Sequence, residues 1–142
     1  MTFTPYSKEQ SINRTKGILH KCSDGTELSQ IQINRKLSNA YKSTPFSPVC
    51  QCCGSEPATE HDHTIAKARC KVLYKTELIW DSRNWSDSCR TCHMQFEQYK
   101  SGEFAQHLNI IERMVFLREH DFEGFKKRLP YIEDERVREA IL

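Results

Sequence analysis

Two cysteine pairs of the form C-x-x-C constrain this chain more than any other feature of its sequence. The two pairs, which 35 residues (54–88) separate, are Cys50 with Cys53 and Cys89 with Cys92. Four thiolates at this spacing can surround a zinc ion tetrahedrally, with Zn–S bonds of about 2.3 Å. Gly54 follows the first pair and tolerates the positive φ that the returning chain needs. We therefore predict a structural zinc site that holds this segment together.

The other cysteines do not compete well for this site. Seven cysteines are many for an intracellular protein, and an odd total does not fit a complete disulfide framework. Cys52 is an alternative to the first pair, but it lacks a partner at the right spacing. Cys22 and Cys70 also lack such partners, so we do not expect them to bind metal. Because four thiolates saturate zinc, catalysis in this chain would require a second metal.

The length of 142 residues favours a single domain with a modest core. Only 37% of the residues are hydrophobic, so a structural metal would help to stabilise that core. We find no apolar run of roughly 18 residues that could span a bilayer, and no apolar segment typical of a signal peptide. We therefore expect an intracellular, cytoplasmic protein that does not contact membranes.

The pattern of apolar residues predicts an α+β fold in which helices flank the zinc-binding segment. We expect an N-terminal basic helical region (1–48), a zinc-bound core (49–102) and a C-terminal helical region (103–142). In the N-terminal region we expect a disordered or short helical segment within 1–21, a turn at 22–25, and a helix that Thr26 caps and that reaches Tyr41. In the core we expect an extended piece at 58–63, β pieces at 71–74 and 77–80 with Trp80 as a core anchor, and a helix from Cys89 to Gly102. In the C-terminal region we expect an amphipathic helix over 103–120, helical turns up to Pro130 and a last short helix within 132–141.

A cluster of acidic and imidazole side chains lies between the cysteine pairs. It consists of Glu60, His61, Asp62 and His63, and His93 follows the second pair directly. Hydrolysis of a phosphodiester needs a general base to activate water and a cation to stabilise the developing charge. A neutral imidazole suits the base because its pKa lies near the working pH. A neighbouring carboxylate supplies the hard oxygen ligand that Mg²⁺ or Mn²⁺ prefers.

This segment resembles the HNH endonucleases, also called ββα-metal or His-Me finger nucleases, in their phage-type version with two C-x-x-C pairs. That family carries an Asp-His pair, a later Asn in a loop, and a His or Asn just after the second cysteine pair. The matching residues here are Asp62-His63, Asn84 and His93. The stretch N-W-S-D-S-C-R-T-C-H (84–93) is similar to the family motif N-L-x-x-L-C-x-x-C-H.

The resemblance implies a ββα-metal finger and a role for each matching residue. His63 would be the general base, and Asp62 would bind a catalytic Mg²⁺ or Mn²⁺. His93 would be the second ligand of that cation, and Asn84 would orient the base or brace the loop. Glu97, one helical turn after His93, is a further candidate ligand, although a solvated carboxylate is the simpler interpretation.

A second alignment of the acidic cluster is also open. Glu60-His61-Asp62-His63 resembles the doubled D-H-D-H of phage junction-resolving endonucleases, in which case Glu60 would bind the metal and His61 would be the base. We prefer Asp62-His63 because Asp62-His63-Thr64-Ile65 agrees better with the common D-H-I-I form. Ala66 stands where a proline usually follows in that form.

The implied activity is metal-dependent cleavage of DNA, by nicking or by cutting both strands. The alternative is a non-catalytic zinc-finger module that binds nucleic acid. The N-terminal third supports phosphate contact, because residues 1–49 carry seven basic and three acidic side chains, or 7 − 3 = +4. The C-terminal region shows no catalytic signature, and we expect it to pack against the core or to form a homodimer surface. Candidate DNA-backbone contacts are Arg35, Lys36, Lys42, Lys67, Arg69, Lys71 and Lys75.

Overall fold

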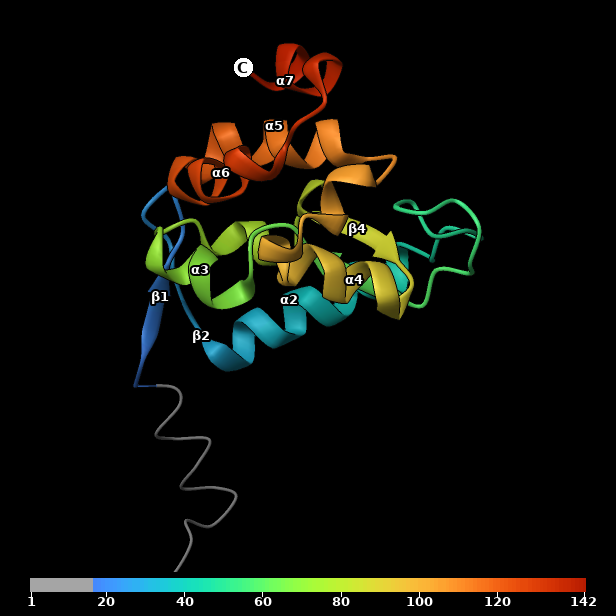
Figure 1. The fold of residues 1–142 in the computed structure, drawn as a ribbon. Coiled ribbons are helices and arrows are strands. Elements are labelled where there is room, and N and C mark those ends of the chain that lie inside the picture. Colours follow the sequence, from blue (N-terminus) through green and yellow to red (C-terminus); the bar gives the residue numbers. More distant parts are fainter. Residues whose placement is uncertain (1–16) are drawn as a thin grey trace, which may run out of the picture.

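The computed structural model describes residues 17–142, which form two small two-stranded antiparallel sheets and six α-helices (Figure 1). The predicted α+β class is therefore confirmed for this part of the chain. The expectation for residues 1–21 falls mostly outside the described residues. Its last three residues, Leu19–Lys21, form strand β1.

A β-hairpin takes the place of the first turn of the expected N-terminal helix. Strand β1 pairs antiparallel with β2 (Glu27–Ser29), across the predicted turn at 22–25. The carbonyl of Thr26 accepts a hydrogen bond from Cys22 N–H in that turn, so the prediction that Thr26 caps the helix was wrong. Helix α2 (Gln30–Ser43) begins instead after Ser29, which forms a capping box with Gln32.

A strand–strand–helix unit forms the centre of the molecule. β3 (Glu60–His63) pairs antiparallel with β4 (Trp85–Ser88), and α4 (Arg90–Glu97) follows β4 almost directly. Asp62 lies opposite Ser86 in this pairing. Because side chains alternate along a strand, Glu60 and Asp62 share one face, and His61 and His63 share the other. His63 is the last residue of β3.

The connection between β3 and β4 is helical rather than extended. It contains α3 (Lys67–Val72) and two 3₁₀ turns, Thr76–Ile79 and Ser82–Asn84, so the predicted β pieces at 71–74 and 77–80 were wrong. β3 and β4 pair with each other residue for residue. The backbone groups of the insert are satisfied locally, for example by Leu73 N–H donating to the Arg69 carbonyl at 3.0 Å.

The tryptophan that anchors the core is Trp85 rather than the predicted Trp80. Trp85 lies on β4 and is 9% exposed, whereas Trp80 is half-buried at the edge of the core. The difference follows from the insert, since Leu78 and Ile79 of the preceding 3₁₀ turn occupy the interior.

The C-terminal region consists of several short helices rather than one long one. A 3₁₀ turn (Tyr99–Ser101) continues α4 up to Gly102, as expected. A second 3₁₀ turn (Glu103–Gln106) then precedes α5 (Ile110–His120). The remaining elements are α6 (Phe122–Arg128), a 3₁₀ turn (Leu129–Tyr131) and α7 (Glu135–Ile141), which confirm the last two expected helices.

The predicted continuous helix over 103–120 is interrupted at residues 107–109. There Leu108 N–H donates to the carbonyl of Cys52 at 2.8 Å, which ties the chain to the first cysteine pair. As a result Leu108, which the helical pattern placed on the apolar face, is 71% exposed. A helix over these residues would use that N–H internally, so the tertiary hydrogen bond replaces a helical one.

The C-terminal helices and α2 cover the central unit from two sides. Figure 1 shows α5 and α6 along one side of the β3–β4–α4 unit, α2 along the other and α7 outside α5. The core that joins them contains Phe96, Phe104, Met114 and Leu117, each at most 1% exposed. Within residues 17–142, none of the helices has both the length and the apolar character needed to cross a bilayer.

Candidate functional site: two adjoining centres

The four predicted cysteines converge in space. One sulfur atom from each of Cys50, Cys53, Cys89 and Cys92 lies within 4.8 Å of every other, an arrangement that can hold a metal ion such as zinc. Gly54 adopts the predicted positive φ, +70°, and a Cβ there would come within 2.8 Å of Leu108 Cδ1. The N–H groups of Cys52 and Cys53 point at Cys50 Sγ, at 3.4 and 3.5 Å. We call this group the four-cysteine cluster.

The pKa values of the thiols in the four-cysteine cluster are shifted in both directions. Hydrogen bonds from Ser55 lower the pKa of Cys53 to about 6. Burial raises the pKa of Cys92, and its neighbours Cys89, Cys50 and Cys53 raise it further. Burial also raises the pKa of Cys89. Thiols packed so closely lose their protons together only when a cation compensates the charge, so the donor set fits a tetrahedral metal.

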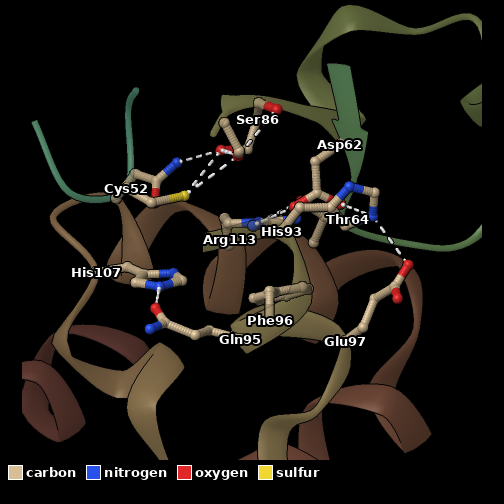
Figure 2. A network of polar contacts seen from close by, with 12 residues as sticks. Cys52, Asp62, Thr64, Ser86, His93, Gln95, Phe96, Glu97, His107 and Arg113 are labelled. Carbon is tan, nitrogen blue, oxygen red and sulfur yellow. Dashed lines mark hydrogen bonds and ion pairs between the residues drawn. The ribbon is translucent and has the colours of Figure 1, made fainter. Parts of the chain in front are cut away.

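The other described cysteines make different contacts. Cys52 is 1% exposed, and its sulfur lies 3.4 Å from Ser86 Oγ and 3.3 Å from Ser88 Oγ on β4 (Figure 2). Cys22 and Cys70 are buried in the main core, away from the four-cysteine cluster. Burial raises the pKa of Cys70 to about 12.

His93 lies among three carboxylates at the start of α4. Its Nδ1 contacts Glu60 on β3, and its Nε2 lies 2.9 Å from Glu97 Oε1 and 3.5 Å from Asp62 Oδ1. Burial alone would lower the pKa of His93, but these three carboxylates raise it above its usual range. The contact with Glu60 holds Nδ1 in a fixed direction, which leaves Nε2 to face Asp62 and Glu97.

Asp62 is almost completely buried, at 2% exposure. Burial raises its pKa, and the positive charges of Arg113 and His93 oppose that effect. Oδ2 of Asp62 lies 3.1 Å from Arg113 Nη1 without the geometry of a hydrogen bond. Oδ1 is directed to His93 (Figure 2). Oδ1 and His93 Nε2 together offer one carboxylate oxygen and one imidazole nitrogen, which are atom types that a divalent cation can use as ligands.

His63 is held as a neutral imidazole with a defined tautomer. Its Nε2 lies 2.7 Å from the carbonyl oxygen of Ile79, which can only accept, so Nε2 carries the proton and Nδ1 keeps a lone pair. Trp85 Nε1–H donates to the same carbonyl at 3.0 Å. Burial lowers the pKa of His63 to about 4. The ring is therefore neutral at neutral pH, with the lone pair of Nδ1 available.

His61 has a different environment on the same face of β3. Its Nδ1 lies 2.6 Å from Asp87 Oδ1, and its side chain is 6% exposed. The ring stacks on Phe46 and Tyr41, with centroid separations of 4.2 and 4.9 Å. These contacts use one ring nitrogen and cover the ring faces, although His61, like His63, lines the cavity described below.

Asn84 fastens the two ends of the β3–β4 connection together. It is fully buried, its Oδ1 accepts from Ile65 N–H at 2.7 Å, and its Nδ2 donates to the carbonyls of Ile65 and Leu78, each at 3.0 Å. Ile65 follows the strand that carries Asp62 and His63, and Leu78 immediately precedes Ile79, which holds the His63 ring. The position suits a brace for the loop.

A cavity of about 490 Å³ lies beside the histidines and the carboxylate of the central unit. Asp62, His63, His93 and Glu97 line it together with cationic side chains from two other elements, and we call it the cleft. The cationic lining residues are Lys67 and Arg69 of α3 and Lys127 and Arg128 of α6. Arg69 also forms a two-bond ion pair with Asp121, at 3.0 and 3.2 Å.

The other predicted DNA contacts lie away from the cleft. Lys71 donates to Gln30 and Lys75 to the carbonyl of His120, so both are partly engaged within the chain. Lys36 lies over the Trp80 ring, 5.4 Å from its centroid. Arg35 and Lys42 are exposed on α2.

Sequence reasoning missed several groups at this site. It read the C-terminal region as packing, yet Arg113 of α5 contacts Asp62, and Lys127 and Arg128 of α6 line the cleft. The alternative alignment predicts Glu60 only as a metal ligand, whereas in the structure Glu60 contacts His93. A signal for Arg113 did exist, because it interrupts the apolar stripe of a helix between Ile110 and Met114, where a charge is costly unless paired.

Comparison with known proteins gave no match: no family model, no curated protein and no solved structure is similar to this chain at a significant level.

Proposed function

We propose that this protein is a metal-dependent DNA endonuclease that hydrolyses phosphodiester bonds. One observation carries the proposal: the cleft brings Asp62 Oδ1 and His93 Nε2 to 3.5 Å from each other and has a neutral His63 in its lining. A cation site beside a general base is the minimum that phosphodiester hydrolysis requires. Asp62, His63 and His93 also occur in the same order as the matching residues of HNH endonucleases, which supports the same activity.

Asp62 and His93 would hold the catalytic cation, Mg²⁺ or Mn²⁺. Neighbouring ligand atoms of an octahedral cation with bonds of about 2.1 Å lie roughly 3 Å apart, close to the observed 3.5 Å. Glu97 Oε1, at 2.9 Å from His93 Nε2, is positioned to contribute or to hold a water. Once bound, such a cation would stabilise the negative charge that develops on the phosphate and on the leaving oxygen.

His63 would act as the general base. Its Nδ1 accepts the proton of the attacking water, while Nε2–H remains bonded to the Ile79 carbonyl, which also stabilises the resulting imidazolium. Asp62 and His63 point to opposite faces of β3, and both reach the cleft because the strand ends at His63. Asp62 can therefore face the cation while the neighbouring His63 faces the attacking water.

The cationic lining of the cleft supports a polyanionic substrate. Lys67 and Lys127 are exposed and Arg128 lies along the same cavity, whereas the charge of Arg69 is paired with Asp121. These side chains offset the carboxylates around His93 and could contact phosphates on either side of the bond that is cleaved. The four-cysteine cluster, saturated by a zinc ion, would keep β4 and α4 in place without taking part in the chemistry.

A plasmid-nicking assay tests this proposal. Zinc-loaded protein should convert supercoiled DNA to open-circular or linear forms with Mg²⁺ or Mn²⁺, and not when both are omitted. His63→Ala should abolish cleavage, and His61→Ala should retain a measurable rate. If DNA binds but is never cleaved, the chain is instead a non-catalytic zinc-finger module. If His61→Ala is inactive and His63→Ala is active, the alternative alignment is correct.

A further inference from the structure

Arg113 is a buried charge on a helix outside the central β3–β4–α4 unit. It lies on α5, is 3% exposed, and its Nη1 lies 3.1 Å from Oδ2 of Asp62. We propose that Arg113 is a positioning residue, which holds the Asp62 carboxylate so that Oδ1 faces the cation shared with His93. The inference rests on the proposed cation site, and it extends that site to the C-terminal region.

Three contacts fix the guanidinium of Arg113. Its Nε–H donates to Thr64 Oγ1 at 2.9 Å, and its central carbon lies 3.4 Å from the centroid of the Phe96 ring (Figure 2). The third contact is the one with Asp62. A planar guanidinium with one face on an aromatic ring and one edge on a hydroxyl has little freedom to rotate.

These contacts link the two halves of the cation site. Thr64 follows His63 at the end of β3 and is therefore two residues from Asp62. Phe96 lies on α4, one turn after His93. Arg113 thus touches the strand segment that carries one ligand and the helix that carries the other. Its side chain connects the two elements whose spacing determines the 3.5 Å between Asp62 Oδ1 and His93 Nε2.

Stability gives no sufficient reason for this arrangement. Among residues 17–142, Nη1 and Nη2 of Arg113 and Oδ2 of Asp62 have no partner with hydrogen-bond geometry. Buried ion pairs often stabilise a fold less than apolar side chains of the same volume would. The arrangement does have a geometric consequence. Because Arg113 lies against Oδ2 of Asp62, Oδ2 cannot face a cation, and only Oδ1 is directed to His93.

The test measures Mn²⁺ binding directly, by calorimetry on zinc-loaded protein, and cleavage separately. Arg113→Met should weaken Mn²⁺ binding about 10- to 100-fold, the range typical for residues that orient a metal ligand. In the nicking assay the metal concentration for half-maximal rate should rise by a similar factor, while KM for DNA at saturating metal stays unchanged. Arg113→Lys, which retains the charge, should recover part of the affinity.

A matched control is Arg118→Met on the same helix. Arg118 donates to the carbonyl of Ile141 at 2.7 Å, so its loss should leave the Asp62 carboxylate in place and Mn²⁺ affinity unchanged. Zinc content and circular dichroism should be the same in all variants. If Arg113→Met fails to fold, Thr64→Val provides the milder change, since it removes only the hydroxyl that Arg113 uses and should weaken Mn²⁺ binding in the same direction.

Two results overturn the inference: unchanged or tighter Mn²⁺ binding in folded Arg113→Met, or no Mn²⁺ binding by the wild-type protein. Failure of the proposed function looks different. In that case the wild-type protein binds Mn²⁺, Arg113→Met weakens that binding, and neither protein cleaves DNA.

Discussion

Nε2 of His93, on α4, lies 3.5 Å from Oδ1 of Asp62, on β3. This pair joins two elements of the central unit, and both residues line the cleft. The two atoms share no hydrogen bond, and imidazole nitrogen and carboxylate oxygen are both atom types that can bind a divalent cation, so substitutions of this pair test the proposed cation site directly.

Removing either member of this pair should remove cation-dependent activity. We expect Asp62→Asn and His93→Ala each to reduce the nicking rate by at least ~100-fold, because a cation held by one remaining protein ligand binds weakly. Rates measured over a range of Mn²⁺ concentrations check this. Glu97→Gln serves as the comparison, and a loss as large as that of Asp62→Asn would mean that Glu97 is a full ligand.

His63 should make the free energy of unfolding depend on pH. Its pKa is about 4 in the folded protein, against about 6.5 in an unfolded chain. The unfolded state therefore binds this proton first as the pH falls, and stability is lost between about pH 6.5 and pH 4. From the two pKa values, the wild-type protein should lose about 2 kcal/mol of unfolding free energy between pH 7 and pH 5 through His63. The His63→Gln variant should not show this contribution.

Urea unfolding of wild-type and His63→Gln protein at these two pH values, in buffer without added divalent cations, measures the difference. Equal losses of stability in the two proteins would show that His63 does not remain neutral in the fold.

Asn84 should matter for folding as well as for activity. Asn84→Ala leaves the N–H of Ile65 and the carbonyls of Ile65 and Leu78 without their partner in a fully buried position. We expect a loss of about 2–4 kcal/mol in unfolding free energy, measured by urea titration. Asn39→Ala, at an exposed position of α2, should change stability by less than ~0.5 kcal/mol. Comparable effects at both positions would contradict the role of Asn84 as a brace.

The four-cysteine cluster should bind one zinc ion per chain. Cys92→Ala should lower the zinc content and destabilise the fold, because three remaining thiolates cannot complete the tetrahedron. Cys52→Ala should keep the full zinc content, since Cys52 contacts the serines of β4 instead. Elemental analysis of the purified proteins provides the measurement. Loss of zinc in Cys52→Ala would place Cys52 among the ligands.

Cationic residues of the cleft should contribute to DNA affinity through phosphate contacts. Lys67→Ala and Lys127→Ala should each weaken binding at all sequences and reduce the slope of log affinity against log salt by about 1. Lys126→Ala is the matched control, because Lys126 neighbours Lys127 but pairs with Glu123 at 2.9 Å. Fluorescence anisotropy at several salt concentrations tests this. Equal slopes for all three variants and the wild type would remove the cleft from the DNA-binding surface.

Sequence reasoning was most accurate where the signal is local. The glycine after Cys53, the extended segment before His63 and the helix after Cys89 all follow from neighbouring residues. It failed at residues 71–80, where β-branched and aromatic residues predicted strands. There the tertiary pairing of β3 with β4 over their whole length left the insert to fold on local hydrogen bonds.

The sequence by itself determines the two cysteine pairs and the order of the candidate site residues, which are Asp62, His63, Asn84 and His93. Residue types and their spacing can be read directly from the sequence. The tertiary structure decided what each side chain touches. Contacts between Glu60 and His93, 33 positions apart, and between Arg113 and Thr64, 49 positions apart, depend on how α4 and α5 pack against β3. The different surroundings of His61 and His63 likewise come from the tertiary structure: Phe46 and Tyr41 stack on His61, whereas the carbonyl of Ile79 holds His63, because burial and hydrogen bonding act through space rather than along the chain.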